Sequence, residues 1–90
     1  MKEITKTILI GNKLGLHARP AAQLVKVASR FSSDIVFVRG GEKVNAKSIM
    51  GVLMLAAPQG TSLRVIASGE DAAQAVREIE SLVEGKFGEE

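Results

Sequence analysis

The sequence contains no cysteine, tryptophan or tyrosine, and it has only three phenylalanines and one histidine among 90 residues. The absence of cysteine excludes disulfide bonds and thiolate metal ligands, and one histidine supplies too few ligands for a structural zinc site. So few aromatic rings also leave little on which nucleic-acid bases could stack. We therefore expect a protein without a metal, a cofactor or a nucleic-acid partner.

Long apolar runs are also missing. The longest, Ile49–Ala57, reaches about half of a membrane span, and the first residues lack the apolar stretch of a signal peptide. The formal net charge of +2 is too small to favour nucleic acid. These features predict a cytoplasmic protein without membrane insertion, and a chain of 90 residues predicts one domain over residues 1–90.

The order of apolar patterns predicts an α+β fold. β-branched runs favour strands, and apolar residues three and four apart favour helices. In chain order we predict a strand over Glu3–Ile10, a helix from Ala18, a strand over Asp34–Val38, a return strand over Glu42–Asn45, a helix from Ser48 to about Leu55, a strand over Thr61–Ser68 and a helix over Asp71–Glu84. The four strands can form one antiparallel sheet with three helices on one face, which is an open-faced β-sandwich of order βαββαβα.

Local signals refine these boundaries. Lys6 interrupts the apolar face of the first strand. Pro20 falls in the first turn of its helix, where a missing N–H costs nothing. The apolar stripe of that helix extends to Phe31, and Gly85 is expected at the C′ position of the last helix.

The only histidine, His17, lies in "KLGLHARP", where a loop meets a predicted helix. The first N–H groups of a helix have no internal partners, and the helix dipole adds positive charge, so this end suits a phosphate group. Arg19 adds a guanidinium fork, and neutral imidazole is a good nucleophile. No carboxylate in this stretch pairs with His17, so a phosphoryl-accepting role is favoured over acid–base catalysis. A lone histidine at a helix start is nonetheless most often a surface or capping residue.

The segment "KSIMGVLML" predicts a short helix that is apolar on nearly every side. Such a helix can bury only one face in a two-layer fold, so some apolar side chains should stay exposed. Ile49, Met50 and Leu53 share the predicted exposed side, whereas Val52 and Leu55 are candidates for the core. Complete burial of all of them is the alternative. Ser48 is an N-cap on pattern alone, and a phosphate on it would add charge beside the apolar patch.

The combination of "GLHARPA" and "KSIMGVLML", within this order of elements, resembles the HPr family, the histidine-containing phosphocarriers of the bacterial phosphotransferase system. The resemblance covers essentially the whole chain. It implies that His17 carries a phosphoryl group on Nδ1 and that Arg19 assists. It further implies that Ile49, Met50 and Leu53 form a docking surface and that Ser48 is a regulatory phosphorylation site.

The family also implies partners. His17 would accept the phosphoryl group from enzyme I, which phosphoenolpyruvate charges, and would pass it to the A domain of a sugar-specific enzyme II. An HPr kinase/phosphorylase would act on Ser48. The resemblance thus implies a stoichiometric carrier and not an enzyme, and we expect a monomer.

Three alternatives stay open at this point. A nitrogen-related HPr would feed a regulatory chain instead of sugar uptake. A pure interaction module would act through the helix after Ser48 and would not need His17. A nucleic-acid-binding protein would use a basic face and show steep salt dependence, with the candidate residues Lys13, Arg19, Lys26 and Arg30.

Overall fold

The computed structural model describes residues 2–89 and has the predicted order of elements with one addition. The strands and helices are β1 (Glu3–Leu9), α1 (Ala18–Ala28), β2 (Asp34–Arg39), β3 (Glu42–Asn45), α2 (Ile49–Met54), β4 (Ser62–Ser68) and α3 (Ala72–Glu84). The addition is a short 3-10 helix, η1 (Lys86–Gly88), which follows α3. The predicted bounds agree with these to within one residue, except at the end of α1, where the predicted apolar stripe runs three residues past Ala28.

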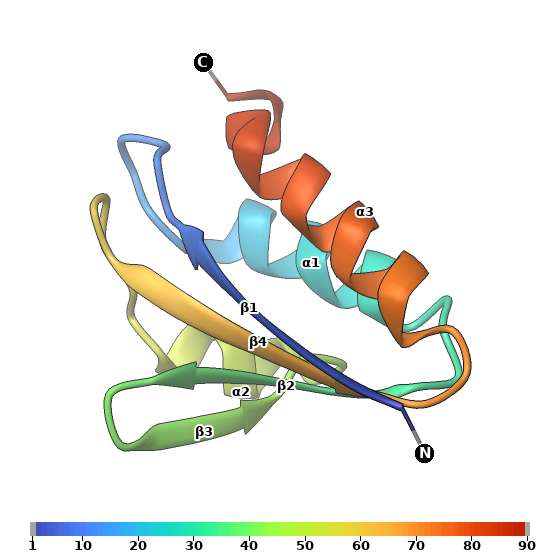
Figure 1. Cartoon of the computed structure of the whole chain (residues 1–90). Helices are drawn as coiled ribbons and strands as arrows, with labels where there is room; N and C mark the ends of the chain where they lie inside the picture. Colours follow the sequence, from blue (N-terminus) through green and yellow to red (C-terminus); the bar gives the residue numbers. More distant parts are fainter. Residues whose placement is uncertain (1, 90) are drawn as a thin grey trace.

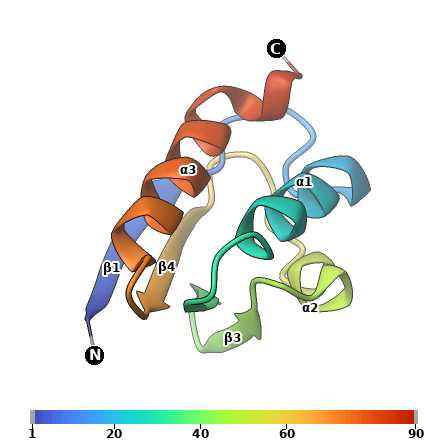
Figure 2. The same cartoon turned by 90° about the vertical axis from the view of Figure 1, so that its right-hand side faces the viewer.

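The four strands form one antiparallel sheet in the order β1-β4-β2-β3. Helices α1 and α3 lie across one face of this sheet (Figure 1). Helix α1 contacts both α3 and α2, so it occupies the middle of the helical layer (Figure 2). This is the open-faced sandwich that the sequence predicts, with the other sheet face uncovered.

Alternation along the strands builds the core between the two layers. Ile8 pairs with Leu63 and Phe37 pairs with Val65 in the sheet register, and all four side chains are buried. The helices contribute further buried residues to the same cluster, among them Ala21, Leu24, Ala75, Val76 and Ile79. The core therefore combines one face of the sheet with the apolar stripes of the helices.

Two residues depart from the simple strand and helix patterns: Lys6 lies on the apolar face of β1, and Phe31 is buried beyond the end of α1. Lys6 lies on the helix-facing side of β1, but β1 is the edge strand, and the Lys6 ammonium reaches Glu80 of α3 at 3.3 Å. Phe31 is buried as predicted, although α1 already ends at Ala28. Its carbonyl accepts a hydrogen bond from Lys47 Nζ at 2.7 Å, which ties the end of the α1 segment to the residues before α2.

The prediction for the end of α3 is wrong in detail. Gly85 is the C-cap with a φ of −80°, and the left-handed residues are Lys86 at +55° and Phe87 at +57°. Phe87 is buried in the core, and this burial holds two non-glycine residues in a conformation that they rarely adopt. The chain consequently turns after α3 and passes over the loop between β1 and α1 (Figures 1 and 2).

None of the helices in the described part of the chain has the length and apolar character to cross a bilayer.

Candidate functional site

The loop before α1 is shaped by Gly15. Its φ is +68°, and an added Cβ would lie 2.4 Å from the carbonyl oxygen of Ala57. This close approach lets the N–H of Leu16 donate to the same carbonyl at 2.8 Å. Leu16 is buried, so the residue after it, His17, emerges from the surface as the N-cap of α1.

The start of α1 presents unpaired donors beside His17. The first helical hydrogen bond runs from the N–H of Ala21 to the carbonyl of His17 at 3.0 Å. Pro20 is in the first turn, as predicted, and has no N–H. Within residues 2–89, no acceptor engages the backbone N–H of Ala18 or Arg19. These two groups and the helix dipole therefore provide local positive character next to the imidazole.

The imidazole of His17 is about one-third exposed and lines an open pocket of ≈ 440 Å³. The other lining residues come from both ends of the chain: Lys13, Leu14, Arg19, Gly88 and Glu89. Arg19 is exposed and follows His17 by two residues, so the structure brings together the two residues predicted for phosphate chemistry.

No carboxylate lies in the stretch around His17, but the fold brings one to the imidazole from a distant part of the sequence. Nε2 of His17 lies 2.7 Å from Oε2 of Glu89, which is 72 residues away in the sequence. The other oxygen, Oε1, accepts a hydrogen bond from Nδ2 of Asn12 at 2.9 Å. Asn12 is fully buried, and the same Nδ2 donates to the carbonyl of Gly15 at 2.8 Å. Sequence reasoning missed Asn12 and Glu89 because no local spacing relates either residue to His17.

The surroundings of Glu89 favour its ionised form. Burial raises its pKa, but hydrogen bonds from Asn12 and His17 and the positive charges of His17 and Arg19 outweigh burial, so the pKa is lowered overall. An ionised carboxylate can only accept hydrogen bonds. The imidazole Nε2 that faces it is therefore the donor in this contact.

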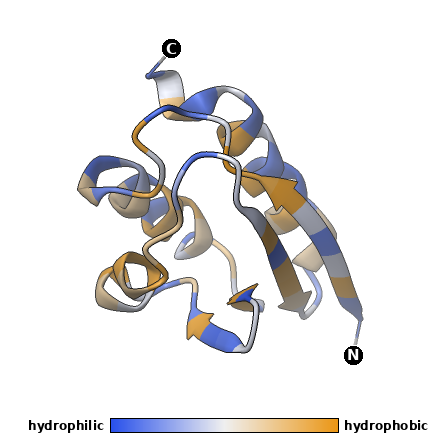
Figure 3. Ribbon diagram, turned by 90° about the vertical axis from the view of Figure 1, so that its left-hand side faces the viewer, coloured by the Kyte–Doolittle hydropathy of each residue, from blue (hydrophilic) through white to orange (hydrophobic). Residues whose placement is uncertain are grey.

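Helix α2 lies beside α1 and carries the second predicted site (Figure 2). Its ribbon is coloured as hydrophobic along most of its length (Figure 3). Ile49 is 46% exposed and Met50 70% exposed, as predicted, while Leu53 is only half-buried against the core. Val52 and Leu55 are buried, which also agrees with the prediction. The prediction omitted three exposed apolar residues, Met54 of α2, Leu14 of the pocket before α1 and Leu9 of β1.

Ser48 caps α2 as predicted. Its Oγ accepts a hydrogen bond from the N–H of Gly51 at 3.1 Å. The side chain is partly exposed and stands directly before Ile49 and Met50. A negative charge at Ser48 would therefore be next to the exposed apolar side chains of α2.

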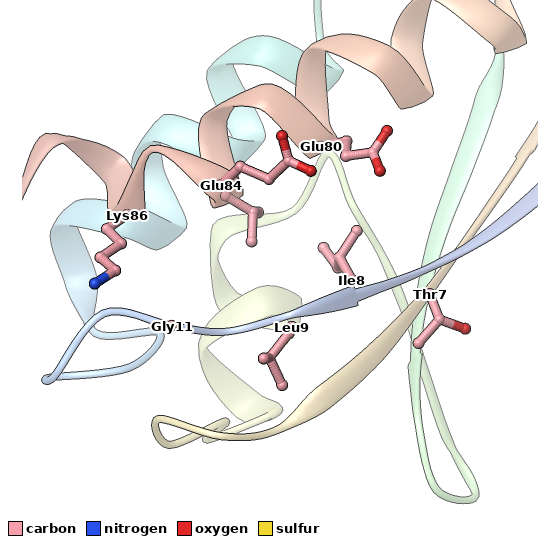
Figure 4. Close-up of a pocket in the computed structure, with 8 residues that line it drawn as sticks. Thr7, Ile8, Leu9, Gly11, Glu80, Glu84 and Lys86 are labelled. Atoms are coloured by element: carbon pink, nitrogen blue, oxygen red, sulfur yellow. The ribbon is translucent and has the colours of Figure 1, made fainter.

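A second hollow separates β1 from the end of α3 (Figure 4). Glu80 and Glu84 of α3 line it on one side, and Ile8 of β1, which points toward α3, lines it on the other. Lys86 extends toward the loop at Gly11 (Figure 4), and a Cβ added to that glycine would lie 3.8 Å from Cε of Lys86. None of the predicted site residues lines this hollow.

One of the basic residues considered for nucleic-acid binding has its charge paired with a carboxylate. Arg30 forms a salt bridge with Glu78 of α3. In the described residues 2–89, no three histidine, aspartate or glutamate side chains come close enough together to hold a metal ion.

Comparisons with known proteins agree on one family. A family model described as "PTS HPr component phosphorylation site" matches residues 4–85. The phosphocarrier protein HPr of Treponema pallidum is 48% identical over 87 residues, which cover 97% of this chain and 99% of that protein.

Solved structures give the same result. A crystal structure of HPr from Thermoanaerobacter tengcongensis superposes with a TM-score of 0.91 at 51% identity, and the match covers 100% of this chain and 99% of that one. A structure described as an HPr dimer from the same organism gives a TM-score of 0.78 at 50% identity, with 99% of this chain and 100% of that one covered.

Proposed function

The chain belongs to the HPr family of phosphocarriers of the bacterial phosphotransferase system, and from this premise we propose that His17 is the residue that carries the phosphoryl group. The observation that carries the proposal is the position of His17 as N-cap of α1, beside the N–H groups of Ala18 and Arg19, which have no acceptor among residues 2–89. It is also the only histidine in the chain. A nucleophile and an anion-binding helix end therefore coincide at one residue.

The transfer proceeds by direct displacement at phosphorus. Nδ1 of His17 attacks the phosphoryl group of the donor phosphohistidine, an N–P bond forms at Nδ1, and the N–P bond of the donor breaks. The electron pair of that bond returns to the donor nitrogen. The helix end and the guanidinium of Arg19 stabilise the phosphoryl oxygens as they arrive. The reverse sequence passes the group to the next histidine, so the protein is a stoichiometric carrier and not an enzyme that turns over a substrate alone.

We propose enzyme I as the donor and the A domain of a sugar-specific enzyme II as the acceptor. Both would dock on the surface formed by Ile49, Met50 and Leu53, here called the docking surface. Two of these side chains are largely exposed although they are apolar, and α2 packs beside α1, at whose start His17 lies. An exposed apolar patch of this kind fits a protein partner, and methionine suits a surface that must accept more than one.

We propose Ser48 as a regulatory phosphorylation site for an HPr kinase/phosphorylase. Its hydroxyl caps α2, so a phosphate there would interact favourably with the start of the helix. It would also place about two negative charges beside Ile49 and Met50. Docking would then weaken without unfolding of the helix.

We propose that residues 1–90 act as one domain in the cytoplasm, without a metal or cofactor, and as a monomer. The last point has a direct test because a dimer of a related HPr has been crystallised. Sedimentation equilibrium should give the mass of one chain, and a dimer mass at micromolar concentration would contradict the proposal.

Phosphorylation with enzyme I and phosphoenolpyruvate tests the central proposal. We expect acid-labile phosphate on His17 of the wild-type protein and none on His17→Ala, because no other imidazole exists in the chain. Arg19→Ala should be labelled, but about tenfold more slowly, because a charge-assisted hydrogen bond to the phosphoryl group is lost. Equal labelling of His17→Ala and wild type would overturn the assignment.

A further inference from the structure

The carboxylate of Glu89 is held in a defined position at the histidine site. Its side chain is only 12% exposed, and both of its oxygens are engaged, Oε2 at Nε2 of His17 and Oε1 at Nδ2 of Asn12. Burial of Phe87 and the left-handed turn at Lys86 bring this residue back over the loop. The position of Glu89 therefore depends on the core of the protein.

Asn12 fixes the orientation of that carboxylate. Its amide group faces two acceptors, the carbonyl of Gly15 and Oε1 of Glu89, and only the nitrogen end can donate to both. Its own Oδ1 is buried and has no hydrogen-bond partner among the described residues. An unpaired buried oxygen costs free energy, so the amide is held in this orientation by its two donated bonds. One carboxylate oxygen is thereby left for the imidazole.

This arrangement determines which nitrogen of His17 carries the proton. The ionised carboxylate accepts a hydrogen bond from Nε2–H, and a neutral imidazole has only one N–H. The lone pair therefore lies on Nδ1, to which no hydrogen bond runs from any residue between 2 and 89. A carboxylate that orients a histidine and selects its tautomer is a recurring device at nucleophilic sites.

We propose that Glu89 is a positioning residue for phosphoryl transfer: through Nε2 it holds His17 in the tautomer and orientation that make Nδ1 the nucleophile. This inference rests on the proposed role of His17. The proton stays on Nε2 while the N–P bond forms at Nδ1 and the N–P bond of the donor breaks, so no proton has to be removed by another group. The ring gains positive charge in this step, and the carboxylate of Glu89 balances it.

Two substitutions separate this role from a merely structural one. In Glu89→Gln, the amide oxygen can accept from Asn12, and the amide N–H₂ then faces Nε2 and requires it to accept. The variant thus keeps the shape of the contact but favours the tautomer with the proton on Nδ1. Glu89→Ala removes the contact and leaves the ring free. If Glu89 positions His17, Glu89→Gln should be phosphorylated more slowly than Glu89→Ala. If Glu89 only fixes the C-terminal segment, the opposite order is expected.

The experiment measures tautomer and rate on the full chain. Nitrogen-15 spectra of the imidazole, recorded at about pH 8.5 so that an ordinary histidine is neutral, report the fraction of rings protonated at Nε2. We expect this fraction to fall in the order wild type, Glu89→Ala, Glu89→Gln. The rate constant for phosphorylation by phosphorylated enzyme I should fall in the same order, by about tenfold for the Gln variant.

The control is Glu84→Gln, which removes an exposed carboxylate on α3 that has no contact with His17. Its tautomer fraction and rate should match the wild type. A Glu89→Gln protein with the wild-type tautomer and rate, or a Glu89→Ala protein that is slower than Glu89→Gln, would overturn the inference. Absence of label on His17 in the wild type would instead reject the proposed function, and the spectra of the unphosphorylated protein would still show whether Glu89 selects the tautomer of His17.

Discussion

At the scale of single residues, the site depends on a glycine as much as on the histidine. Gly15 combines a φ of +68° with a close approach to the carbonyl of Ala57. Its own carbonyl accepts from Asn12, which in turn holds Glu89. One residue without a side chain thus links the loop, the buried amide and the carboxylate that faces His17.

The first prediction concerns that glycine. Gly15→Ala should lower the free energy of unfolding by about 2–4 kcal/mol, because left-handed strain and a clash with backbone act together. Gly40→Ala is a matched control, since Gly40 has a φ of +59° and nothing within 4 Å of an added Cβ. It should cost about 1–2 kcal/mol. Urea unfolding measures both, and equal losses would show that the close approach carries no cost.

At the scale of elements, α2 is divided between two roles. Val52 and Leu55 are buried in the core, whereas Ile49 and Met50 are exposed beside the cap residue Ser48. A short apolar helix therefore stabilises the fold on one side and leaves apolar side chains exposed on the other, where we propose that partners dock. Its sequence predicts this division because residues three and four apart lie on one face of a helix.

A second prediction tests the docking surface. Met50→Glu and Ser48→Asp each place a negative charge beside the apolar side chains of α2, so each should reduce the rate of phosphorylation by phosphorylated enzyme I by about tenfold. Thr5→Glu adds the same charge on the exposed edge strand β1, at the opposite edge of the sheet from β3, and should leave the rate unchanged. If all three variants react at the wild-type rate, α2 is not the docking surface.

At the scale of the whole molecule, Asp71 joins the start of α3 to the segment between α1 and β2. Its carboxylate accepts hydrogen bonds from the backbone N–H of Ser32 at 2.9 Å and of Ser33 at 3.0 Å. Both serine hydroxyls donate to it as well. The hydroxyl of Ser33 and the backbone of Ser32 lower the pKa of Asp71 from 3.8 to about 2, against a smaller opposing effect of burial.

The lowered pKa of Asp71 makes the stability of the fold depend on pH. The carboxylate of the unfolded chain keeps its ordinary pKa, so Asp71 stabilises the fold above about pH 4, and this contribution is lost as the pH falls toward 2. Asp71→Asn should lower the melting temperature at neutral pH. Between about pH 4 and pH 2, the melting temperature of this variant should decrease less than that of the wild type. Asp34→Asn, at an exposed position of β2, is the control. An Asp71→Asn protein with the pH dependence of the wild type would contradict this role.

Much of the fold could be predicted because its information is local. The alternation in Glu3–Leu9 and the spacing of apolar residues in α1 and α3 are properties of short windows, and they predict strand and helix directly. The cap at Ser48 is equally local, because a hydroxyl three residues before Gly51 can reach only the first turn. The prediction for the C-terminal turn is wrong because glycine is the usual left-handed residue, whereas here Lys86 and the buried Phe87 adopt that conformation.

The sequence by itself determined the order of elements, the layer that each apolar face occupies, and the place of His17 at the start of a helix beside Arg19. The tertiary structure alone decided the partner of the imidazole. Glu89 and His17 are 72 residues apart, and their contact requires β1, α1 and α3 to pack together and the chain to turn back after α3. Periodicity encodes which face of an element is buried, but it does not encode which distant side chain then meets it, because that depends on how the packed elements bring their ends together.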